Sequence, residues 1–335
     1  MSQSKDLHIY GIGNAIMDIQ LQALDTDIEH LKLTKGGMAL VDAEVQRDLL
    51  EFFRGKPLFQ ASGGSAANTM IAACQLGART GYGCVVGDDP FGSYYWKEMA
   101  ELGVELHNAP RPGGPTGTCV ILITPDSERT MNTHLGISAA FSESDLSEEA
   151  IARAEWLYIE GYLLTSPSGS AAAARACEIA RETGTKIAVS FADAFVVAQF
   201  REALDSVVRY ADLVFANKTE AETFAGSDDE ERAFDVLKNQ LPNAVMTLHE
   251  RGARVWYDGE VLSVPSFPVV AVDSTGAGDM FAGAMLQGLV AGRSAGHAAK
   301  VACFYASRVV SQIGARLQGD LSGLASEAGI QLSAE

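Results

Sequence analysis

The sequence has no run of apolar residues long enough to cross a bilayer, and residues 1–6 lack the apolar region of a signal peptide. Its five cysteines are scattered, with no Cys-x-x-Cys pair and no neighbouring His ligands, which argues against a disulfide framework or a zinc site. Basic residues are scarce, because 25 Lys and Arg stand against 43 Asp and Glu, a net charge of −18. These features predict a cytoplasmic protein that binds neither nucleic acid nor a membrane.

Several motifs with known chemistry are also missing. There is no Gly-x-x-x-x-Gly-Lys-Ser/Thr loop, no Gly-x-Ser-x-Gly elbow and no His-x-x-x-His spacing. Gly11 and Gly13 lack the third glycine of a dinucleotide-binding fingerprint, and residues 17–22 alternate apolar and polar side chains with the period of a strand. The sequence therefore disfavours a P-loop, a serine hydrolase and a dinucleotide-binding start.

A glycine-rich turn at residues 273–279 precedes an apolar, helix-competent run. The amide groups of Gly276, Ala277 and Gly278 are predicted to converge at a helix N-terminus, which is a favourable place for an anion. Asp279 would then face the charge that it repels, which makes sense for a base that takes a proton from an attacking hydroxyl group. The simpler alternative is a first-turn Asp that stabilises the helix dipole.

Strands and helices alternate regularly after residue 144, with expected strands at 156–160, 186–191, 212–216 and 245–248. This order predicts a doubly wound α/β fold with a mainly parallel sheet and a ligand site at the C-terminal ends of the strands. Residues 116–132 are expected to form a hairpin with a polar turn at 125–128. We assign 15–42 and 109–135 to a small β-sheet lid, and 1–14, 43–108 and 136–335 to the core.

Further polar candidates lie at predicted strand and helix ends. Asp18 belongs to the polar face of strand 17–22, whereas Gly63 and Gly64 let the backbone approach a ligand that Asn68 would reach from the next turn. A small-residue helix packed on a strand is the alternative. Asn217 and Glu220 suit a hydrated magnesium ion, although helix capping explains the same pair.

Three separated motifs together resemble the ribokinase-like (PfkB) family of carbohydrate and nucleoside kinases: residues 63–68 with 87–92, residues 217–220, and residues 273–279. The resemblance implies ATP as co-substrate, Mg²⁺, Asp279 as catalytic base and residues 276–278 as an anion hole. It also implies that sugar hydroxyl groups are held by Asn14, Asp18, Gly63, Gly64 and Asn68.

The same resemblance implies an ATP side of the site. Asn217 and Glu220 would act around Mg²⁺ and the phosphates, Glu220 through water, and Thr247 and Gly252 would line the nucleotide. His249 stands where the family usually has glycine, which is a departure from the pattern. In some members, residues at the positions of Asp273 and Thr275 help to form a monovalent-cation site, so K⁺ is a further candidate.

Within this family the chain is most similar to the adenosine kinases, in residues 13–19, 115–119, 161–165, 194–200 and 217–224. Residues Ile16, Leu40, Tyr162 and Phe195 would sandwich a purine, or would be ordinary core. The expected reaction is transfer of the γ-phosphoryl group of ATP to the 5′-hydroxyl of a nucleoside, adenosine first. Inosine, guanosine, ribose and fructose remain alternatives, as does a catalytically idle nucleoside-binding regulator. The sequence leaves open whether the protein is a monomer or a homodimer.

Overall fold

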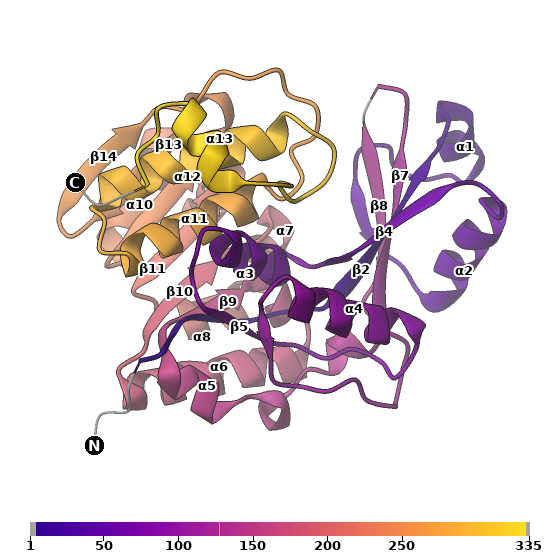
Figure 1. Ribbon diagram of the computed structural model, residues 1–335, viewed down its shortest axis with the longest axis horizontal. Helices are drawn as coiled ribbons and strands as arrows, with labels where there is room; N and C mark the ends of the chain where they lie inside the picture. The colour runs from indigo at the N-terminus through magenta and orange to yellow at the C-terminus, as the bar shows by residue number, and fades with distance from the viewer. Residues whose placement is uncertain (1–4, 127, 333–335) are drawn as a thin grey trace.

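The computed structural model describes residues 5–126 and 128–332, which form two β-sheets and the helices around them (Figure 1). The expected doubly wound α/β fold is confirmed. The larger sheet has nine strands in the order β14-β13-β12-β11-β10-β9-β1-β5-β6. They are β1 (Leu7–Ile12), β5 (Thr80–Gly83), β6 (Glu105–Leu106), β9 (Ala154–Glu160), β10 (Lys186–Ser190), β11 (Leu213–Asn217), β12 (Ala244–Thr247), β13 (Ala253–Tyr257) and β14 (Glu260–Val264).

The large sheet is parallel from β12 to β6, and the pairings of β12 with β13 and of β13 with β14 are antiparallel. Successive side chains of each strand enter two different cores, as Ile9 and Tyr10 of β1 show. Helices cover both faces of the sheet, as a parallel sheet requires. One core includes α3 (Ser65–Gln75), α4 (Pro90–Glu101), α11 (Ala277–Val290) and α12 (Ala295–Val310). The other includes α5 (Glu148–Arg153), α6 (Pro167–Thr183), α8 (Arg201–Val208), α9 (Lys218–Ala225) and α10 (Glu230–Gln240).

Local sequence explains where these helices begin and end. The side chain of Asp89 accepts a hydrogen bond from the amide of Gly92 and caps α4, whose first residue is proline. Helix α6 likewise follows a Ser166 cap and a proline, and ends at Gly184 in the left-handed conformation (φ 67°). The remaining α-helices of the described residues are α1 (Asp25–His30), α2 (Ala43–Phe52), α7 (Ala194–Gln199) and α13 (Leu321–Glu327).

The smaller sheet has five strands in the order β3-β8-β7-β2-β4 and lies beside the main body (Figure 1). Its strands are β2 (Ile16–Gln22), β3 (Met38–Leu40), β4 (Leu58–Gly63), β7 (Gly117–Ile123) and β8 (Arg129–His134). One face packs against α1 and α2 through Leu21, Val120 and Leu122. The opposite face carries Ile16 and Ile121, and the period of two places Asp18 on this same face.

The expected division of the chain needs one correction. We assigned residues 43–108 to the core, but α2 packs on the smaller sheet and β4 is one of its edge strands. The apolar residues of α2 would fit against the main body or against the smaller sheet. Only the antiparallel pairing of β4 with β2 shows that this part of the chain belongs to the smaller sheet. Strands β7 and β8 form the predicted hairpin, whereas residue 127 of its turn and residues 1–4 and 333–335 of the expected core segments lie outside the described residues.

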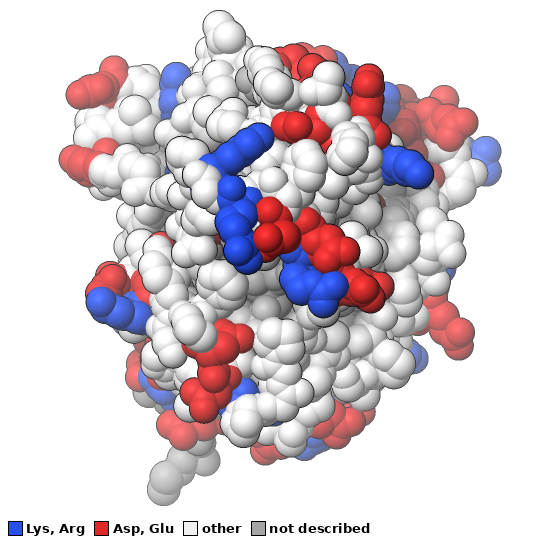
Figure 2. Space-filling view, turned by 90° about the vertical axis from the view of Figure 1, so that its right-hand side faces the viewer, with Lys and Arg blue, Asp and Glu red and all other residues white. Residues whose placement is uncertain are grey.

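Figure 2 shows the side of the molecule that carries the smaller sheet, where acidic and basic side chains are intermixed. Close to the smaller sheet, Lys35 pairs with Asp25 of α1. Within the described ranges, no helix combines the length and apolar character needed to cross a membrane.

Candidate active site

The glycine-rich turn forms the N-terminus of α11, as predicted. Gly276 is its N-cap in the left-handed conformation (φ 74°), and the helix starts at Ala277. The amide of Ala277 donates to the carbonyl of Ser274 at 3.3 Å, whereas in the described part of the chain the amides of Gly278 and Asp279 have no acceptor. A Cβ atom built on Gly278 would meet nothing within 4 Å. The turn therefore presents free donors to open space, and an anion fits there.

The carboxylate of Asp279 is half-buried beside this turn. Ser65 Oγ donates to its Oδ1 at 2.7 Å, and Asn68 Nδ2 donates to its Oδ2 at 3.2 Å. Burial raises the pKa of Asp279 to about 6, against the lowering effect of these hydrogen bonds and of the charge of Arg316. Asp279 is thus ionised at neutral pH and is basic enough to accept a proton.

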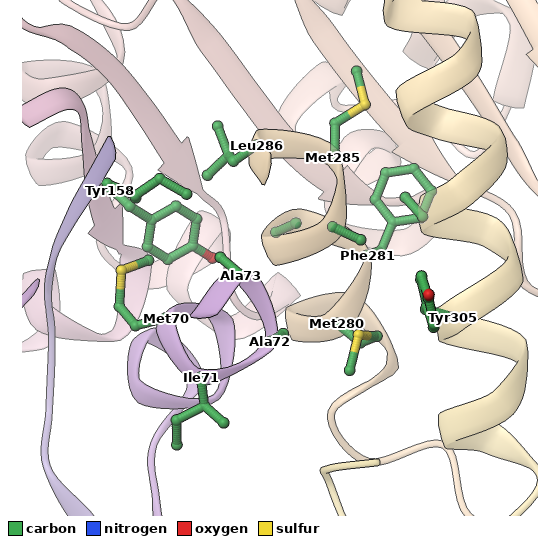
Figure 3. Close-up of a cluster of buried hydrophobic side chains, with 14 of the residues drawn as sticks. Met70, Ile71, Ala72, Ala73, Tyr158, Met280, Phe281, Met285, Leu286 and Tyr305 are labelled. Carbon is green, nitrogen blue, oxygen red and sulfur yellow. The ribbon is translucent and has the colours of Figure 1, made fainter. Parts of the chain in front are cut away.

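Close packing between α3 and α11 brings these three residues together. Figure 3 shows the shared core of the two helices, with Met70 and Ala73 on one side and Met280 and Leu286 on the other. A Cβ atom on Gly283 would lie 2.6 Å from the carbonyl oxygen of Thr69, so the helices approach each other as only glycine allows. The first turns of both helices therefore meet, and α3 supplies the hydrogen bonds to Asp279.

Asp18 approaches the same place from β2 of the smaller sheet. A Cβ atom on Gly63 would lie 2.7 Å from Cγ of Asp18, and a Cβ atom on Gly64 (φ 101°) would collide with the carbonyl oxygen of Asn14. The two glycines are therefore needed for this close approach. Burial raises the pKa of Asp18 to about 6, against the lowering effect of the charges of Arg316 and Arg129, and the charge of Asp279 contributes to the rise.

Asn14 is buried and held by a residue that the sequence analysis did not identify, Glu160 at the end of β9. Glu160 Oε1 accepts hydrogen bonds from the amide (3.1 Å) and from Nδ2 (3.3 Å) of Asn14, and Oε2 accepts one from the amide of Ala66 (2.7 Å). Burial raises the pKa of Glu160 to about 7. The sequence did contain a signal for Glu160, because a carboxylate at the end of a buried strand indicates a candidate site residue.

Arg129 of β8 was also missed, and it connects the smaller sheet to the loop before α11. Its guanidinium group pairs with the carboxylate of Asp273, and both side chains are less than a tenth exposed. Asp273 also accepts hydrogen bonds from the amides of Thr275 (3.0 Å) and Gly314 (2.8 Å). In this structure an arginine neutralises the carboxylate that we expected near a monovalent cation, so the K⁺ site stays a prediction.

Asn217 and Glu220 adopt the helix-capping arrangement that was their alternative interpretation. The amide of Glu220 donates to Asn217 Oδ1 at 2.9 Å, and the amide of Asn217 donates to Glu220 Oε2 at 2.9 Å. Burial raises the pKa of Glu220 to about 7, against the lowering effect of the hydrogen bond from the Asn217 amide, and the charges of Asp193 and Asp279 contribute to the rise. The described residues contain no group of three or more His, Cys, Asp or Glu side chains that could hold a metal. Mg²⁺ fits only with water and phosphate as its other ligands.

Thr247 ends β12, next to the short helical turn His249–Arg251. His249 has a positive φ of 53°, which few side chains adopt and which explains why glycine would suit this position. The amide of Leu248 donates to the carbonyl of Gly252 at 2.7 Å and closes the turn. Thr247 lies at the same edge of the large sheet as Asn217, and the two residues are paired in register.

Two aromatic candidates lie at the neighbouring strand ends. Tyr162 belongs to the short helical turn Gly161–Thr165 that follows β9, and its hydroxyl group donates to Asp193 at 3.4 Å. Phe195 begins α7 after β10, is 38% exposed, and contacts Phe200 edge to face. The apolar face of the smaller sheet, with Ile16, carries half-exposed Leu40 in strand β3.

Comparisons with known proteins agree with this geometry. Residues 54–320 match the model of the pfkB family carbohydrate kinases. Adenosine kinase 2 of Arabidopsis thaliana is 28% identical over 93% of this chain and 95% of its own. A fructokinase of Klebsiella pneumoniae is 30% identical over 73% of this chain and 81% of its own. The crystal structure of adenosine kinase from Sinorhizobium meliloti superposes with a TM-score of 0.89 and 34% identity, covering 96% of this chain and 99% of that one.

The family model covers most of the chain and includes the glycine-rich turn, Asp279 and the Asn217–Glu220 pair. The chain therefore belongs to the pfkB family of carbohydrate kinases and is a phosphotransferase with an alcohol acceptor.

Proposed function

We propose that this protein transfers the γ-phosphoryl group of ATP to the 5′-hydroxyl group of adenosine and forms AMP. The observation that carries the chemistry is the Asp279 carboxylate, held by Ser65 and Asn68 beside the free amide of Gly278. Phosphoryl transfer needs a group that accepts the proton of the hydroxyl nucleophile and donors that stabilise charge on the transferred group. This arrangement supplies both within one helical turn.

In the proposed reaction Asp279 takes the proton from the 5′-hydroxyl, and the amides of residues 276–278 donate hydrogen bonds to the phosphoryl oxygens. Asp18 and Asn14 hold the ribose hydroxyl groups, so the acceptor is oriented before it reacts. Gly63 and Gly64 let the backbone approach it. Closing the smaller sheet over the acceptor excludes water and limits ATP hydrolysis.

Kinases of this family use ATP, typically with Mg²⁺. When bound, Mg²⁺ would supply positive charge that stabilises the phosphate groups. Glu220 would hold it through water, and Asn217, Thr247 and Gly252 would contact the phosphates and the nucleotide. Asp273 and Thr275 are the candidates for a K⁺ site.

Adenosine is the proposed acceptor because two well-covered relatives are adenosine kinases and because the face of the smaller sheet that carries Asp18 also carries Ile16 and Leu40. Ile16 and Leu40 would contact one face of the purine, and Tyr162 and Phe195 the other. The low content of basic residues supports small-molecule substrates and argues against a nucleic-acid partner. We place the reaction in the cytoplasm, in a monomer or a homodimer.

A sugar kinase is the second candidate, because the Klebsiella pneumoniae fructokinase is also a relative. Inosine, guanosine and ribose differ from adenosine only in the part that the apolar face contacts. A catalytically idle regulator is the third candidate, although the free amides beside Asp279 argue against it.

A coupled assay with Mg·ATP tests the proposal across adenosine, inosine, guanosine, cytidine, ribose and fructose, with and without K⁺. We expect adenosine to have the highest kcat/KM. A higher value for fructose or ribose would replace the nucleoside with a sugar and leave the role of Asp279 in place. Adenosine binding without turnover would support the regulator.

A further inference from the structure

Arg316 lies in the loop of residues 311–320 between α12 and α13, yet its side chain is only 11% exposed. Its Nε donates to Asn68 Oδ1 at 3.0 Å, and its Nη2 donates to Ser62 Oγ at 3.1 Å. Asn68 belongs to α3 of the main body, whereas Ser62 belongs to β4 of the smaller sheet. One guanidinium group therefore connects both parts of the site.

These contacts determine how the Asn68 amide is oriented. A guanidinium group only donates hydrogen bonds, so the atom of Asn68 that faces Arg316 is the oxygen. The nitrogen is then turned toward Asp279, to which it donates at 3.2 Å. If the amide were flipped, nitrogen would face nitrogen at Arg316 and oxygen would face the carboxylate at Asp279. Both contacts would be repulsive.

The same loop also touches the anion-binding turn. The amide of Gly314 donates to Asp273 at 2.8 Å, and a Cβ atom on Gly276 would lie 2.5 Å from the carbonyl oxygen of Ala315. The loop thus contacts the turn that leads into Asp279 and, through Arg316, the side chain that holds Asp279.

A buried arginine with a purely structural role is normally paired closely with a carboxylate, and Arg316 is not. Its closest carboxylate in the described part of the chain is Glu98, at 3.9 Å. Burying a guanidinium group without a close ionic partner costs stability. Its charge lowers the pKa values of both Asp18 and Asp279, which favours the ionised form of each carboxylate.

We propose that Arg316 is a positioning residue for the phosphoryl transfer. It fixes the Asn68 amide so that this amide donates to Asp279, and it fastens β4 to α3 at the place where the acceptor binds. The inference rests on the proposed function for its kinetic consequences, but the orientation of Asn68 is independent of the substrate.

The first test is Arg316→Met, which keeps side-chain length and removes every donor. We expect kcat to fall by roughly 10- to 100-fold, because a displaced catalytic group costs rate on this scale. KM for ATP should change less than about twofold, since no contact of Arg316 lies on the ATP side. Arg153→Met is the control, because the Arg153 side chain is also mostly buried but pairs with Asp6 and Glu105 just before the start of β9, at the end of the sheet opposite to the site, and its kcat should equal the wild-type value. An unchanged kcat in Arg316→Met would overturn the proposal.

A double-mutant cycle with Asn68→Ala identifies the route of the effect. If Arg316 acts through Asn68, its removal in the Asn68→Ala background should lower kcat by less than about threefold. Equal losses in both backgrounds would overturn the proposal. Arg316→Lys, a milder change, repeats the cycle if Arg316→Met does not fold. A lysine keeps the charge but cannot contact Asn68 and Ser62 as a planar fork, so we expect only partial activity.

A crystal structure of Arg316→Met, or of Arg316→Lys, needs no turnover and separates this proposal from the proposed function. We expect the Asn68 side chain to leave Asp279, with a separation greater than the present 3.2 Å and beyond hydrogen-bond distance. An Asn68 amide that still donates to Asp279 would overturn the positioning role, whatever the substrate is.

Discussion

The two carboxylates of the site have similar pKa values and very different surroundings. Burial raises the pKa of both Asp279 and Asp18 to about 6. Asp279 accepts hydrogen bonds from Ser65 and Asn68, which belong to a helix packed tightly against its own. Asp18 lies on the smaller sheet, and no hydrogen bond from the described residues reaches its carboxylate. The protein therefore holds Asp279 in place before substrate binds, whereas Asp18 has acceptor capacity left for a ligand hydroxyl group.

Under the proposed function, this contrast predicts that Asp279 acts in the reaction and that Asp18 takes part in recognition of the acceptor. A substitution of a residue whose hydrogen-bond partners belong to the protein, such as Asp279, should change kcat. A residue whose partner is the ligand should affect acceptor binding. The predictions below test this division, starting with the largest expected effect.

Asp279→Asn should lower kcat by about 10²- to 10⁴-fold, because the amide cannot accept the hydroxyl proton. Its shape is unchanged, so the affinity for ATP should remain close to the wild-type value. Steady-state kinetics and calorimetric titration of ATP measure the two quantities. Near wild-type turnover would show that Asp279 is not the base.

Asp18→Ala should raise KM for the acceptor by roughly 10- to 100-fold, the loss expected for hydrogen bonds to a charged group. KM for ATP should be unchanged. Acceptor and ATP are varied separately in the same coupled assay. A change confined to the ATP side would place Asp18 outside the acceptor site and would remove the distinction between the two carboxylates.

The pH dependence should follow the raised pKa of Asp279, which is about 6. The base is ionised above this pH and protonated below it, so kcat/KM should be constant near pH 8 and roughly tenfold lower at pH 5. Asp18 titrates in the same range, so the profile of Asp18→Ala shows which part of the decrease belongs to Asp279. A midpoint near the ordinary value for an aspartate would mean that burial does not control this group.

The division between the two regions also explains what the sequence could reveal. The turn at residues 273–279, the parallel sheet and the position of Asp279 follow from local patterns, because glycines, alternation and helix starts are encoded by neighbouring residues. The capping role of the Asn217–Glu220 pair was equally visible as an alternative. In the smaller sheet, β4 could be placed only by its pairing with β2, more than thirty residues earlier in the chain.

Arg316 and Glu160 show a second limit. Arg316 reaches Asn68 across 248 positions, and no local pattern distinguishes it from a surface arginine. Glu160 ends a buried strand, which is a signal, but its three hydrogen bonds depend on how β1 and α3 lie against β9. The residues that are proposed to react belong to motifs that can be recognised in the sequence. The residues that orient them, such as Arg316 and Glu160, can be identified only from tertiary contacts.

The smallest expected effect is a loss of stability, and it separates the packing role of helix α11 from its proposed role in the reaction. Gly283→Ala places a Cβ atom 2.6 Å from the carbonyl of Thr69, so α3 and α11 must separate, which should cost about 1–3 kcal/mol and lower Tm by a few degrees. Gly278→Ala, the matched control, meets nothing within 4 Å and should keep the wild-type Tm while lowering kcat, because the new methyl group occupies the space of the phosphoryl group. Thermal unfolding and the coupled assay are measured on both variants. An unchanged kcat in Gly278→Ala would show that the transferred phosphoryl group does not lie at this turn. An unchanged Tm in Gly283→Ala would show that the contact between α3 and α11 does not depend on glycine.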